Sequence, residues 1–278
     1  PGQFWEAHIK SDSGWHFSGT TFYGAPVLTM GHNEHLGWAH TANQPGVGTM
    51  YKVVFDDPAN PLNYRYDNGY RTATEWKDTI RVKTNGGFEN RVYTFRKTHH
   101  GPIVEKAGEN AYLACRVAQI FEGDRFGQAI RMSKATNFDE WLAAVSELSL
   151  VMFNIAYADN AGNIYYLYNG AVPRRDNSID WESGPVDGTT SKTEWQGLHQ
   201  LPELPQVLNP QSGFVQNCNA TPFLATDDGN PYSYDFPKYM VQEGTRDNRR
   251  AIVSRWHLRQ MEDMTFDEWA AATTDSTV

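Results

Sequence analysis

Short alternating runs of apolar and polar residues, separated by Gly, Asn and Asp, dominate the first two-thirds of the chain. The stretch "KTNGGFENR" places Asn85, Gly86 and Gly87 between two such runs, and these residues tolerate the backbone angles of a hairpin turn. A second hairpin is expected in "NIAYADNAGNIYYLYNGAVP", with its turn at residues 159–163. Because short turns join antiparallel neighbours, the sequence predicts extensive antiparallel sheet.

Helical patterns are fewer, and three are predicted. "TNFDEWLAAVSEL" offers Thr136 or Asn137 as its cap, and its apolar residues fall on one face. "RDNRRAIVSRWHLRQ" is a second helix, and "TFDEWAAATTD" is a third, with Thr265 as cap and Glu268 at the capping-box position. The stretch from about residue 178 to 226 is rich in Pro, Gly and Asn but also holds tryptophans and leucines, so it predicts a long packed loop. The class is α+β.

Charge and apolar content exclude some function classes. The formal net charge of −9 argues against nucleic acid as the main partner, because phosphate binding needs clustered cations. The longest basic run, residues 246–255, is interrupted by acidic and apolar residues and predicts one polar helix face. No apolar run approaches the roughly 20 residues that span a bilayer. The two cysteines, Cys115 and Cys218, allow at most one disulfide and do not fix the redox compartment.

Three histidines lie close together in "PVLTMGHNEHLGWAHTANQPGVGTMY", at His32, His35 and His40. Two of them have the spacing of zinc ligands on a helix, but glycines flank them and the neighbouring runs look like strands. Ordinary turn or surface histidines are therefore favoured over metal ligands. The small residue Ala42 follows Thr41 where the chain leaves the sheet, so a backbone N–H could face a cleft there. A strand end without any function is the alternative.

Five blocks, in this order, resemble the β-subunit of penicillin acylases: "GHNEHLGWAHTAN", "HHGPIV", "NIAYADNAGNIYYLYNGAVPRR", "EWQGLHQLPELPQVLNPQSGFVQNCNATP" and "RDNRRAIVSRW". "FVQNCNATPF" is especially similar to the branch of aculeacin and acyl-homoserine-lactone acylases. The likeness runs from about Phe4 to the last residues. It implies a hydrolase with an N-terminal nucleophile, folded as a four-layer αββα sandwich and cut from a self-cleaving precursor. Residues 1–278 are then expected to be a single partial domain, lacking the nucleophile segment and the α-subunit.

The resemblance also implies a site that cleaves amides. In this family the first residue of the β-chain is a Ser, whose hydroxyl attacks the amide while its own α-amine acts as base. Ala42 matches the position whose backbone N–H is one oxyanion donor, and Asn219 matches the side-chain donor. Arg246 matches an arginine that supports the polar network around that Asn, with Arg249 as a less certain substitute. A turn residue at Asn219 and a solvated cation at Arg246 are the alternatives.

The chain departs from the family pattern at its start. It begins at Pro1, past the position of the nucleophile, and Ser11, Ser13 and Ser18 are not chain termini. We therefore expect the nucleophile to lie upstream, and the 278-residue piece alone to be inactive and poorly stable. The resemblance further implies an α-subunit from the same precursor as partner, and a periplasmic or secreted protein.

A structural calcium ion is common in this family, with acidic ligands in the loop after the Ala42 position. Here that loop reads "NQPGVGTMY", with Gly46 and Thr49 where carboxylates would be expected. Calcium needs several oxygen ligands at close range. The loop therefore argues against calcium, and no cofactor or metal is expected to be required.

The substrate is expected to be a small N-acyl amide of the penicillin, acyl-homoserine-lactone or lipopeptide type. Its acyl pocket would be apolar and aromatic, although plain core is the alternative for every candidate: Phe22, Tyr23, Val47, Met50, Met152 and Phe153. Two rival functions remain. Nine tryptophans and fourteen tyrosines could supply the stacking surfaces of a carbohydrate- or ligand-binding β module. The chain could also be a catalytically dead acylase homologue.

Overall fold

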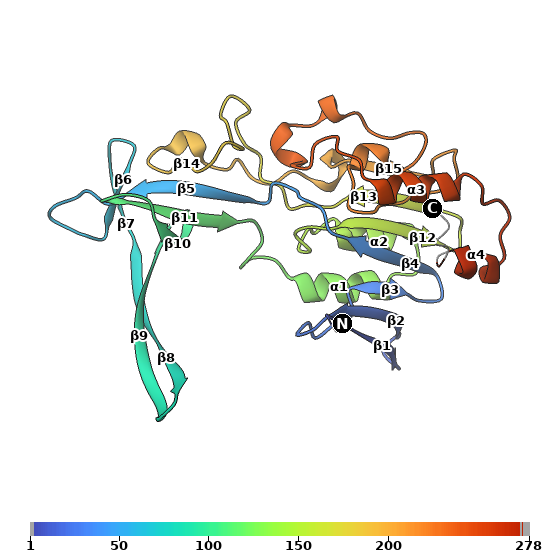
Figure 1. Cartoon of the computed structure of the whole chain (residues 1–278), viewed down its shortest axis with the longest axis horizontal. Coiled ribbons are helices and arrows are strands. Elements are labelled where there is room, and N and C mark those ends of the chain that lie inside the picture. The colour runs from blue at the N-terminus through green and yellow to red at the C-terminus, as the bar shows by residue number, and fades with distance from the viewer. Residues whose placement is uncertain (1–2, 273, 275–278) are drawn as a thin grey trace. The chain divides into compact units, whose positions relative to one another are not determined.

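The computed structural model describes residues 3–272 and 274. The chain divides into two compact units (Figure 1). The first comprises Pro1–Pro45, Phe121–Ala171 and His199–Val278, and the second comprises Gly46–Ile120 and Val172–Leu198. Among the described residues, no helix is long and apolar enough to cross a membrane. The expectation of a single partial domain over residues 1–278 stays a prediction.

The first unit is built on a seven-stranded antiparallel sheet. Its strand order is β1(Phe4–Ser11), β2(Trp15–Phe22), β3(Met30–His32), β4(Leu36–Thr41), β12(Asn154–Asp159), β13(Ile164–Tyr168) and β15(Gln206–Leu208). The chain leaves this sheet after β4 and returns at β12, which pairs with β4 in antiparallel register. Residues more than 100 positions apart in the sequence therefore meet on two neighbouring strands in the middle of the sheet.

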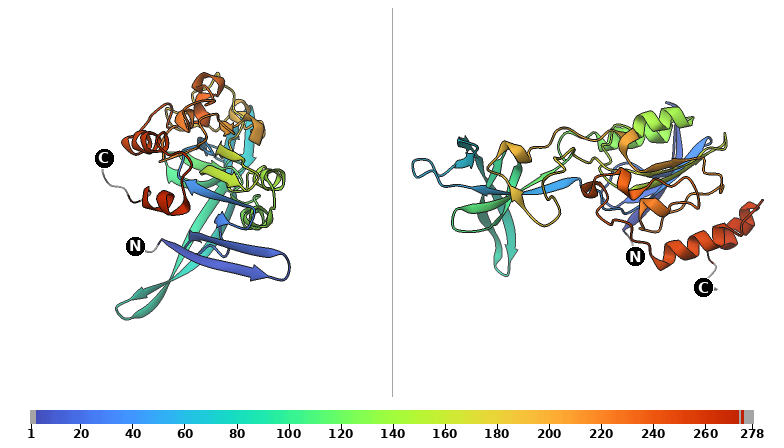
Figure 2. Two further views of the ribbon diagram at one scale, coloured as in Figure 1. Left: turned by 90° about the vertical axis from the view of Figure 1, so that its right-hand side faces the viewer. Right: turned by 90° about the horizontal axis from the view of Figure 1, so that it is seen from above.

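Helices lie on both faces of this sheet (Figure 2). They are α1(Arg125–Lys134) and α2(Phe138–Val145) on one face and α3(Arg249–Leu258) and α4(Phe266–Ala272) on the other. Trp141 of α2 is fully buried, and its ring centroid lies 4.5 Å from that of Tyr157 and 6.1 Å from those of Trp38 and Tyr165. Removing such a side chain typically costs about 3–5 kcal/mol of stability. This aromatic contact fixes α2 against β4, β12 and β13.

The second unit holds a six-stranded sheet and a small hairpin. The sheet order is β14(Val186–Asp187), β5(Gly48–Val54), β11(Ala111–Val117), β10(Gly101–Lys106), β9(Gly87–Thr98) and β8(Thr74–Thr84). Only the β14–β5 pair is parallel among these neighbours. The hairpin is β6(Asn63–Tyr66) with β7(Gly69–Thr72). The core is small: the buried side chains of Tyr51, Val53, Ala114 and Val186 pack together.

Most of the predicted elements are present. The "KTNGGFENR" hairpin is the turn between β8 and β9, and the second predicted hairpin is β12–β13. All three predicted helices form, with Asn137 capping α2, Asn248 capping α3, and Thr265 and Glu268 exchanging capping-box bonds ahead of α4. Residues 273 and 275 of the third predicted helix lie outside the described residues. The α+β class is confirmed.

Two parts of the chain carry structure beyond the prediction. Helix α1 falls in a stretch where no helix was expected. The long loop from about residue 178 to 226 contains the two short strands β14 and β15. Several turns of 3₁₀ helix lie in or beyond it: η1(Ser191–Thr193), η2(Leu201–Glu203), η3(Pro222–Leu224), η4(Ser233–Asp235) and η5(Lys238–Met240).

Candidate active site

Ala42 and Asn219 are in direct contact, although 177 positions separate them. Strand β4 ends at Thr41, so the peptide of Ala42 stands at the sheet edge. The side-chain amide of Asn219 donates to the carbonyl oxygen of Ala42 at 3.0 Å. Asn219 has a left-handed backbone with φ of 59°, which turns its side chain back toward the strand end. The structure thus brings together the two residues that the family resemblance singled out, and their catalytic role stays a prediction.

Asn217 connects three segments at this point. Its Oδ1 accepts hydrogen bonds from the Thr41 hydroxyl at 2.5 Å, from Asn154 Nδ2 at 3.0 Å and from the backbone N–H of Asn219 at 2.7 Å. Its own amide donates to the carbonyl of Ala220 at 3.0 Å. One neutral side chain therefore ties the end of β4 and the start of β12 to the loop that carries Asn219.

Asn154 supports the same peptide from inside the sheet. Its amide also reaches the Ala42 carbonyl, at 3.2 Å, and its Oδ1 accepts from the Tyr166 hydroxyl at 2.6 Å. Asn154 and Tyr166 are buried, and burial raises the pKa of Tyr166 well above its usual value. The Ala42 carbonyl thus accepts from two amides, which matches its two lone pairs. Since both donors are anchored, the orientation of the Ala42 peptide is fixed.

The N-terminus of α3 holds the Asn219 loop from the other side. Asn248 caps the helix by accepting from Ala251 N–H, and its amide donates to the carbonyls of Cys218 at 2.9 Å and Asn219 at 3.2 Å. Arg250 donates to Asn219 Oδ1 at 2.9 Å. A guanidinium can only donate and a carbonyl can only accept, so Oδ1 must face Arg250 and the NH₂ must face Ala42. We call Asn154, Asn217, Asn219 and Asn248 the carboxamide cluster.

The arginine in contact with Asn219 is neither of those named from the sequence. The structure places the backbone of Arg246 against Thr221, whose N–H donates to its carbonyl at 3.1 Å. The guanidinium at Asn219 belongs to Arg250, one residue beyond Arg249. Sequence reasoning also missed Asn154, Asn217 and Asn248. Only Asn248 carried a local signal, as the Asn that directly precedes the helix.

Aromatic rings gather beside Ala42 in the first unit. The Phe153 ring stacks on His40 at 5.3 Å and lies 6.2 Å from Phe22, which contacts Phe4 at 4.6 Å. Burial lowers the pKa of His40 to about 4, so the ring is neutral at pH 7. Phe153 has an unusual φ of 109°, and its N–H donates to Asn43 Oδ1 at 2.7 Å.

The other pocket candidates are more dispersed. Tyr23 has an exposed side chain, and Val47 and Met50 belong to the second unit, where Met50 lies opposite Cys115 on β11. Phe22 and Phe153 are neighbours in the first unit, with ring centroids 6.2 Å apart, and the role of all five residues in a pocket stays a prediction.

The possible metal ligands named from the sequence lie in different surroundings, and whether this protein binds a metal stays a prediction. His32 lies near His8, His16 and Glu34 on the sheet of the first unit. In the described part of the chain, the group of three potential ligands whose ligand atoms all lie within 4.8 Å is His99, His100 and Glu194 of the second unit. The loop after Ala42 is bound by a guanidinium, since Arg175 Nη2 donates to the carbonyls of Gly46 at 2.5 Å and Gly48 at 2.8 Å. Both cysteines are free thiols.

The chain is similar in sequence and in fold to known acylases. The chain is 31% identical to penicillin G acylase of Escherichia coli over 215 residues, which are 76% of this chain and 24% of that protein. It is 24% identical to acyl-homoserine lactone acylase PvdQ of Pseudomonas fluorescens (strain Pf0-1) over 250 residues, which are 80% of this chain and 31% of that protein. The structure of a thermostable penicillin G acylase from Alcaligenes faecalis matches with a TM-score of 0.77 at 23% identity, covering 96% of this chain and 46% of the other.

The structural match establishes a shared fold. The chain spans about a quarter to a third of the length of the two named relatives. The family description "Penicillin amidase" matches all of residues 1–278. The chain therefore belongs to the penicillin amidase family.

Proposed function

We propose that this chain is part of an amidohydrolase that cleaves the amide bond of small N-acyl compounds. The observation that carries this proposal is the contact between Asn219 and the Ala42 peptide in a chain of the penicillin amidase family. A carboxamide has two N–H donors, and only one of them is needed for the Ala42 carbonyl. The backbone N–H of Ala42 belongs to the same residue as that carbonyl, and in this proposal it and the second N–H of Asn219 face one point.

In the proposed reaction, a serine hydroxyl attacks the carbonyl carbon of the substrate amide. The proton of that hydroxyl passes to the α-amine of the same serine, and the carbonyl oxygen becomes an oxyanion. Ala42 N–H and Asn219 Nδ2 then donate to the oxyanion. The α-amine then gives its proton to the nitrogen of the substrate as the C–N bond breaks, and the amine product leaves. Water hydrolyses the remaining acyl-serine ester to free acid and serine. Donors fixed in advance are effective here because they need no rearrangement as the charge develops.

The carboxamide cluster suits this task because it is uncharged. Asn154 binds the Ala42 carbonyl, Asn217 binds the neighbouring Thr41 hydroxyl, and Arg250 holds Asn219 with its NH₂ toward Ala42. Arg250 also adds positive charge behind the amide, which favours a negative oxygen in front of it. Arg246 remains the family-based candidate for a supporting role in this network.

Several parts of the proposal concern the longer protein. We place the nucleophilic serine upstream of this chain, at the N-terminus created when the precursor cleaves itself, and an α-subunit from the same precursor as partner. The complete four-layer αββα arrangement, export to the periplasm or medium, and the absence of a required cofactor or calcium belong to the same proposal. The short span relative to the named relatives supports this division.

The acyl pocket is proposed to lie at the aromatic cluster of Phe22, Phe153 and His40, next to Ala42. Such a lining favours phenylacetyl or fatty acyl groups over charged ones, because the rings offer apolar surface and His40 is neutral. Tyr23, Val47 and Met50 remain further candidates from the sequence.

The test is a kinetic comparison in the matured full-length protein, with a chromogenic N-acyl 4-nitroanilide as substrate. Asn219→Gly removes the amide and keeps the left-handed backbone, which glycine adopts freely. We expect kcat to fall by about 10²–10³-fold, as for other lost oxyanion donors. Asp263→Gly is the matched control, because Asp263 also has a left-handed backbone, with φ of 49°, on the loop between α3 and α4.

The control should keep the turnover of the parent protein. If Asn219→Gly turns over as fast as Asp263→Gly, Asn219 is not an oxyanion donor. If the matured parent releases no amine from any N-acyl amide, the proposed function itself is wrong.

A further inference from the structure

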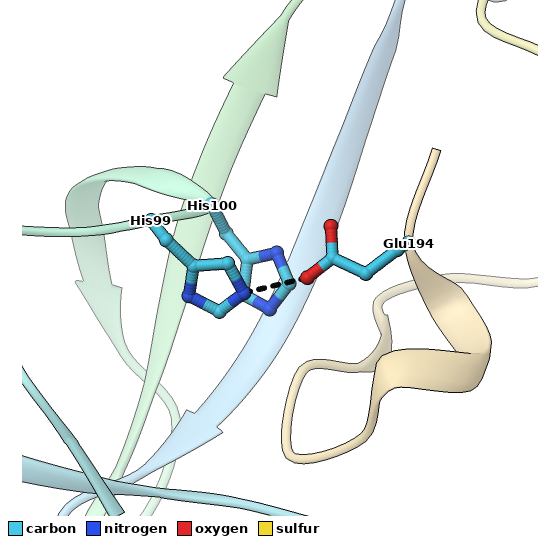
Figure 3. A group of neighbouring side chains, drawn as sticks. All are labelled: His99, His100 and Glu194. Atoms are coloured by element: carbon cyan, nitrogen blue, oxygen red, sulfur yellow. Dashed lines mark hydrogen bonds and ion pairs between the residues drawn. The ribbon is translucent and has the colours of Figure 1, made fainter. Parts of the chain in front are cut away.

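Two histidines and a glutamate converge in the second unit, apart from the proposed active site (Figure 3). His99 and His100 form the turn between β9 and β10, and Glu194 directly follows η1. One nitrogen or oxygen of each side chain lies within 4.8 Å of those of the other two. His99 Nε2 donates to Glu194 Oε1 at 2.7 Å. Two imidazoles and one carboxylate form a ligand set that zinc commonly uses.

The buried ring of His100 has a nitrogen that the fold leaves unused. Its Nε2 donates to the carbonyl of Gly188 at 3.1 Å, so Nδ1 carries the lone pair. His100 has no exposed surface, and its Nδ1 has no hydrogen-bond partner in the part of the chain that the structure describes. Folding normally leaves few buried polar atoms unpaired, so this nitrogen calls for an explanation.

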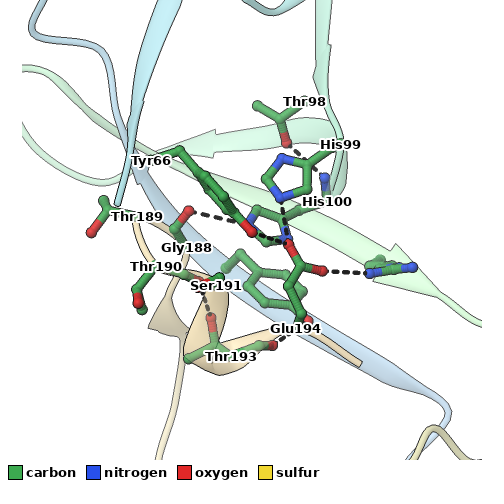
Figure 4. A network of polar contacts seen from close by, with 12 residues as sticks. Tyr66, Thr98, His99, His100, Gly188, Thr189, Thr190, Ser191, Thr193 and Glu194 are labelled. Carbon is green, nitrogen blue, oxygen red and sulfur yellow. Dashed lines mark hydrogen bonds and ion pairs between the residues drawn. The ribbon is translucent and has the colours of Figure 1, made fainter. Parts of the chain in front are cut away.

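The second ring nitrogen of each histidine is held in the way that metal-binding histidines are held. A ligating imidazole usually bonds through its other nitrogen to a carbonyl, carboxylate or hydroxyl, which fixes the ring orientation. His100 makes that bond to Gly188, and His99 Nδ1 makes it to the Tyr64 hydroxyl at 2.8 Å. Figure 4 shows the two rings, both from the β9–β10 turn, beside Glu194 of a separate segment.

The surroundings select the kind of ion. Arg116 donates to Glu194 Oε2 at 3.2 Å, and Arg71 lies over the ring of Tyr66, so two guanidinium groups are near. Calcium and magnesium bind through oxygen and charge, and neither suits a site with two nitrogens and nearby cations. Burial lowers the pKa of both imidazoles, to about 4 for His100, so both are neutral at pH 7.

We propose that His99 Nε2, His100 Nδ1 and the Glu194 carboxylate bind a divalent transition-metal ion of the zinc class. The ion displaces the hydrogen bond between His99 and Glu194. The proton on His99 Nε2 is replaced by one on Nδ1, and this N–H donates a hydrogen bond to the Tyr64 oxygen, so the ring stays neutral. Donor atoms in a tetrahedral zinc site are about 3.3 Å apart, and ligand atoms of the three side chains already lie within 4.8 Å of one another. The centroids of the His99 and His100 rings are now 3.7 Å apart, so the two rings must move apart to bind one ion.

The consequence of such a site is structural. The ion would bind the β9–β10 turn to the segment that carries Gly188 and Glu194, within the second unit. A fourth position would be open to water, since Glu194 and His99 are only half-buried.

The test uses full-length protein treated with a chelator and then titrated with ZnCl₂ or CoCl₂. We expect one equivalent of Zn²⁺ to bind by calorimetry, a rise in Tm, and the visible absorption of four-coordinate cobalt(II). His99→Gln or Glu194→Gln should weaken the affinity by about 100-fold or more, because each removes a ligand. These readouts do not involve amide hydrolysis, so their failure would leave the proposed function untouched.

The control is His16→Gln, which removes an exposed histidine that bonds to Glu34 and stacks on His8 in the first unit. Zinc and cobalt binding should be unchanged in this variant. The proposal is overturned if the parent shows no cobalt absorption, or if His16→Gln abolishes binding while His99→Gln keeps it. The parent's own cobalt spectrum decides the question even where a variant fails to fold.

Discussion

Each of the two units carries a polar cluster, and the two clusters use different kinds of side chain. In the first unit, the carboxamide cluster joins neutral side chains to backbone carbonyls and N–H groups around Ala42. In the second, Glu194 accepts from His99, Tyr66 and Arg116, so ionisable groups make the contacts. Neutral amides fix an orientation at any ordinary pH, whereas the Glu194 cluster depends on which groups carry charge. That difference matches a site that must present donors and a site that would receive a cation.

The largest expected effect is a pH dependence of stability in the first unit, caused by His40 beside the carboxamide cluster. The pKa of His40 is about 4 in the folded chain and 6.5 when exposed, so the unfolded chain binds the extra proton. Stability is therefore fully present above pH 6.5 and falls by up to about 3 kcal/mol as the pH drops to 4. We expect His40→Phe to remove this loss from the first unit, as measured by denaturant unfolding at several pH values. An unchanged pH slope in the variant would show that His40 does not titrate as described.

A somewhat smaller effect is expected from removing a charge in the second unit. Glu194→Ala removes the shared acceptor of three donors, and because these half-buried groups regain hydrogen bonds to water, we expect a total loss of about 1.5–3 kcal/mol, the size of one hydrogen bond to a charged group. The matched control is Glu147→Ala, which breaks a surface pair with Arg131 and should cost less than about 1 kcal/mol. Equal losses in the free energy of unfolding would mean that the Glu194 cluster is no more than a surface ion pair.

The smallest effect compares two helix caps. Asn248 caps α3 and also holds the Asn219 loop, whereas Asn137 caps α2 alone. Replacing either by Ala should cost about 1 kcal/mol of stability. Only Asn248→Ala should also lower kcat for an N-acyl amide, because it frees the carbonyl of Asn219. Equal activity in both variants would separate the cap from the proposed oxyanion donor.

Features set by neighbouring residues could be predicted from the sequence, and features that depend on contacts between distant residues could not. Turn residues such as Asn85 to Gly87 and caps such as Asn137 act on their own neighbours, so they are visible in a short window. Helix α1 was missed because Gly127 lowers the intrinsic stability of the helix by about 1 kcal/mol relative to Ala. Burial of Ala129 and Met132 in the folded chain stabilises the helix instead.

The site could be predicted only where a family motif carried it. Ala42 and Asn219 came from resemblance, and the structure brings them into contact. The supporting residues could not be found in the same way. Asn217 binds Thr41 although 176 positions separate them, and no local pattern in a single sequence indicates a pairing over that distance. Arg250 and Arg246 are equally basic in the sequence, but Arg246 precedes the Asn248 cap and Arg250 lies in the first turn of α3, and only the structure shows which one reaches Asn219.

The central claim is that Ala42 N–H and Asn219 Nδ2 serve one oxyanion. Its most direct test is a crystal structure of the matured full-length protein with a boronate or phosphonate that mimics the tetrahedral intermediate. We predict one ligand oxygen at about 2.7–3.1 Å from both donors. A ligand oxygen bound elsewhere, with Asn219 Nδ2 turned away from it, would contradict the account.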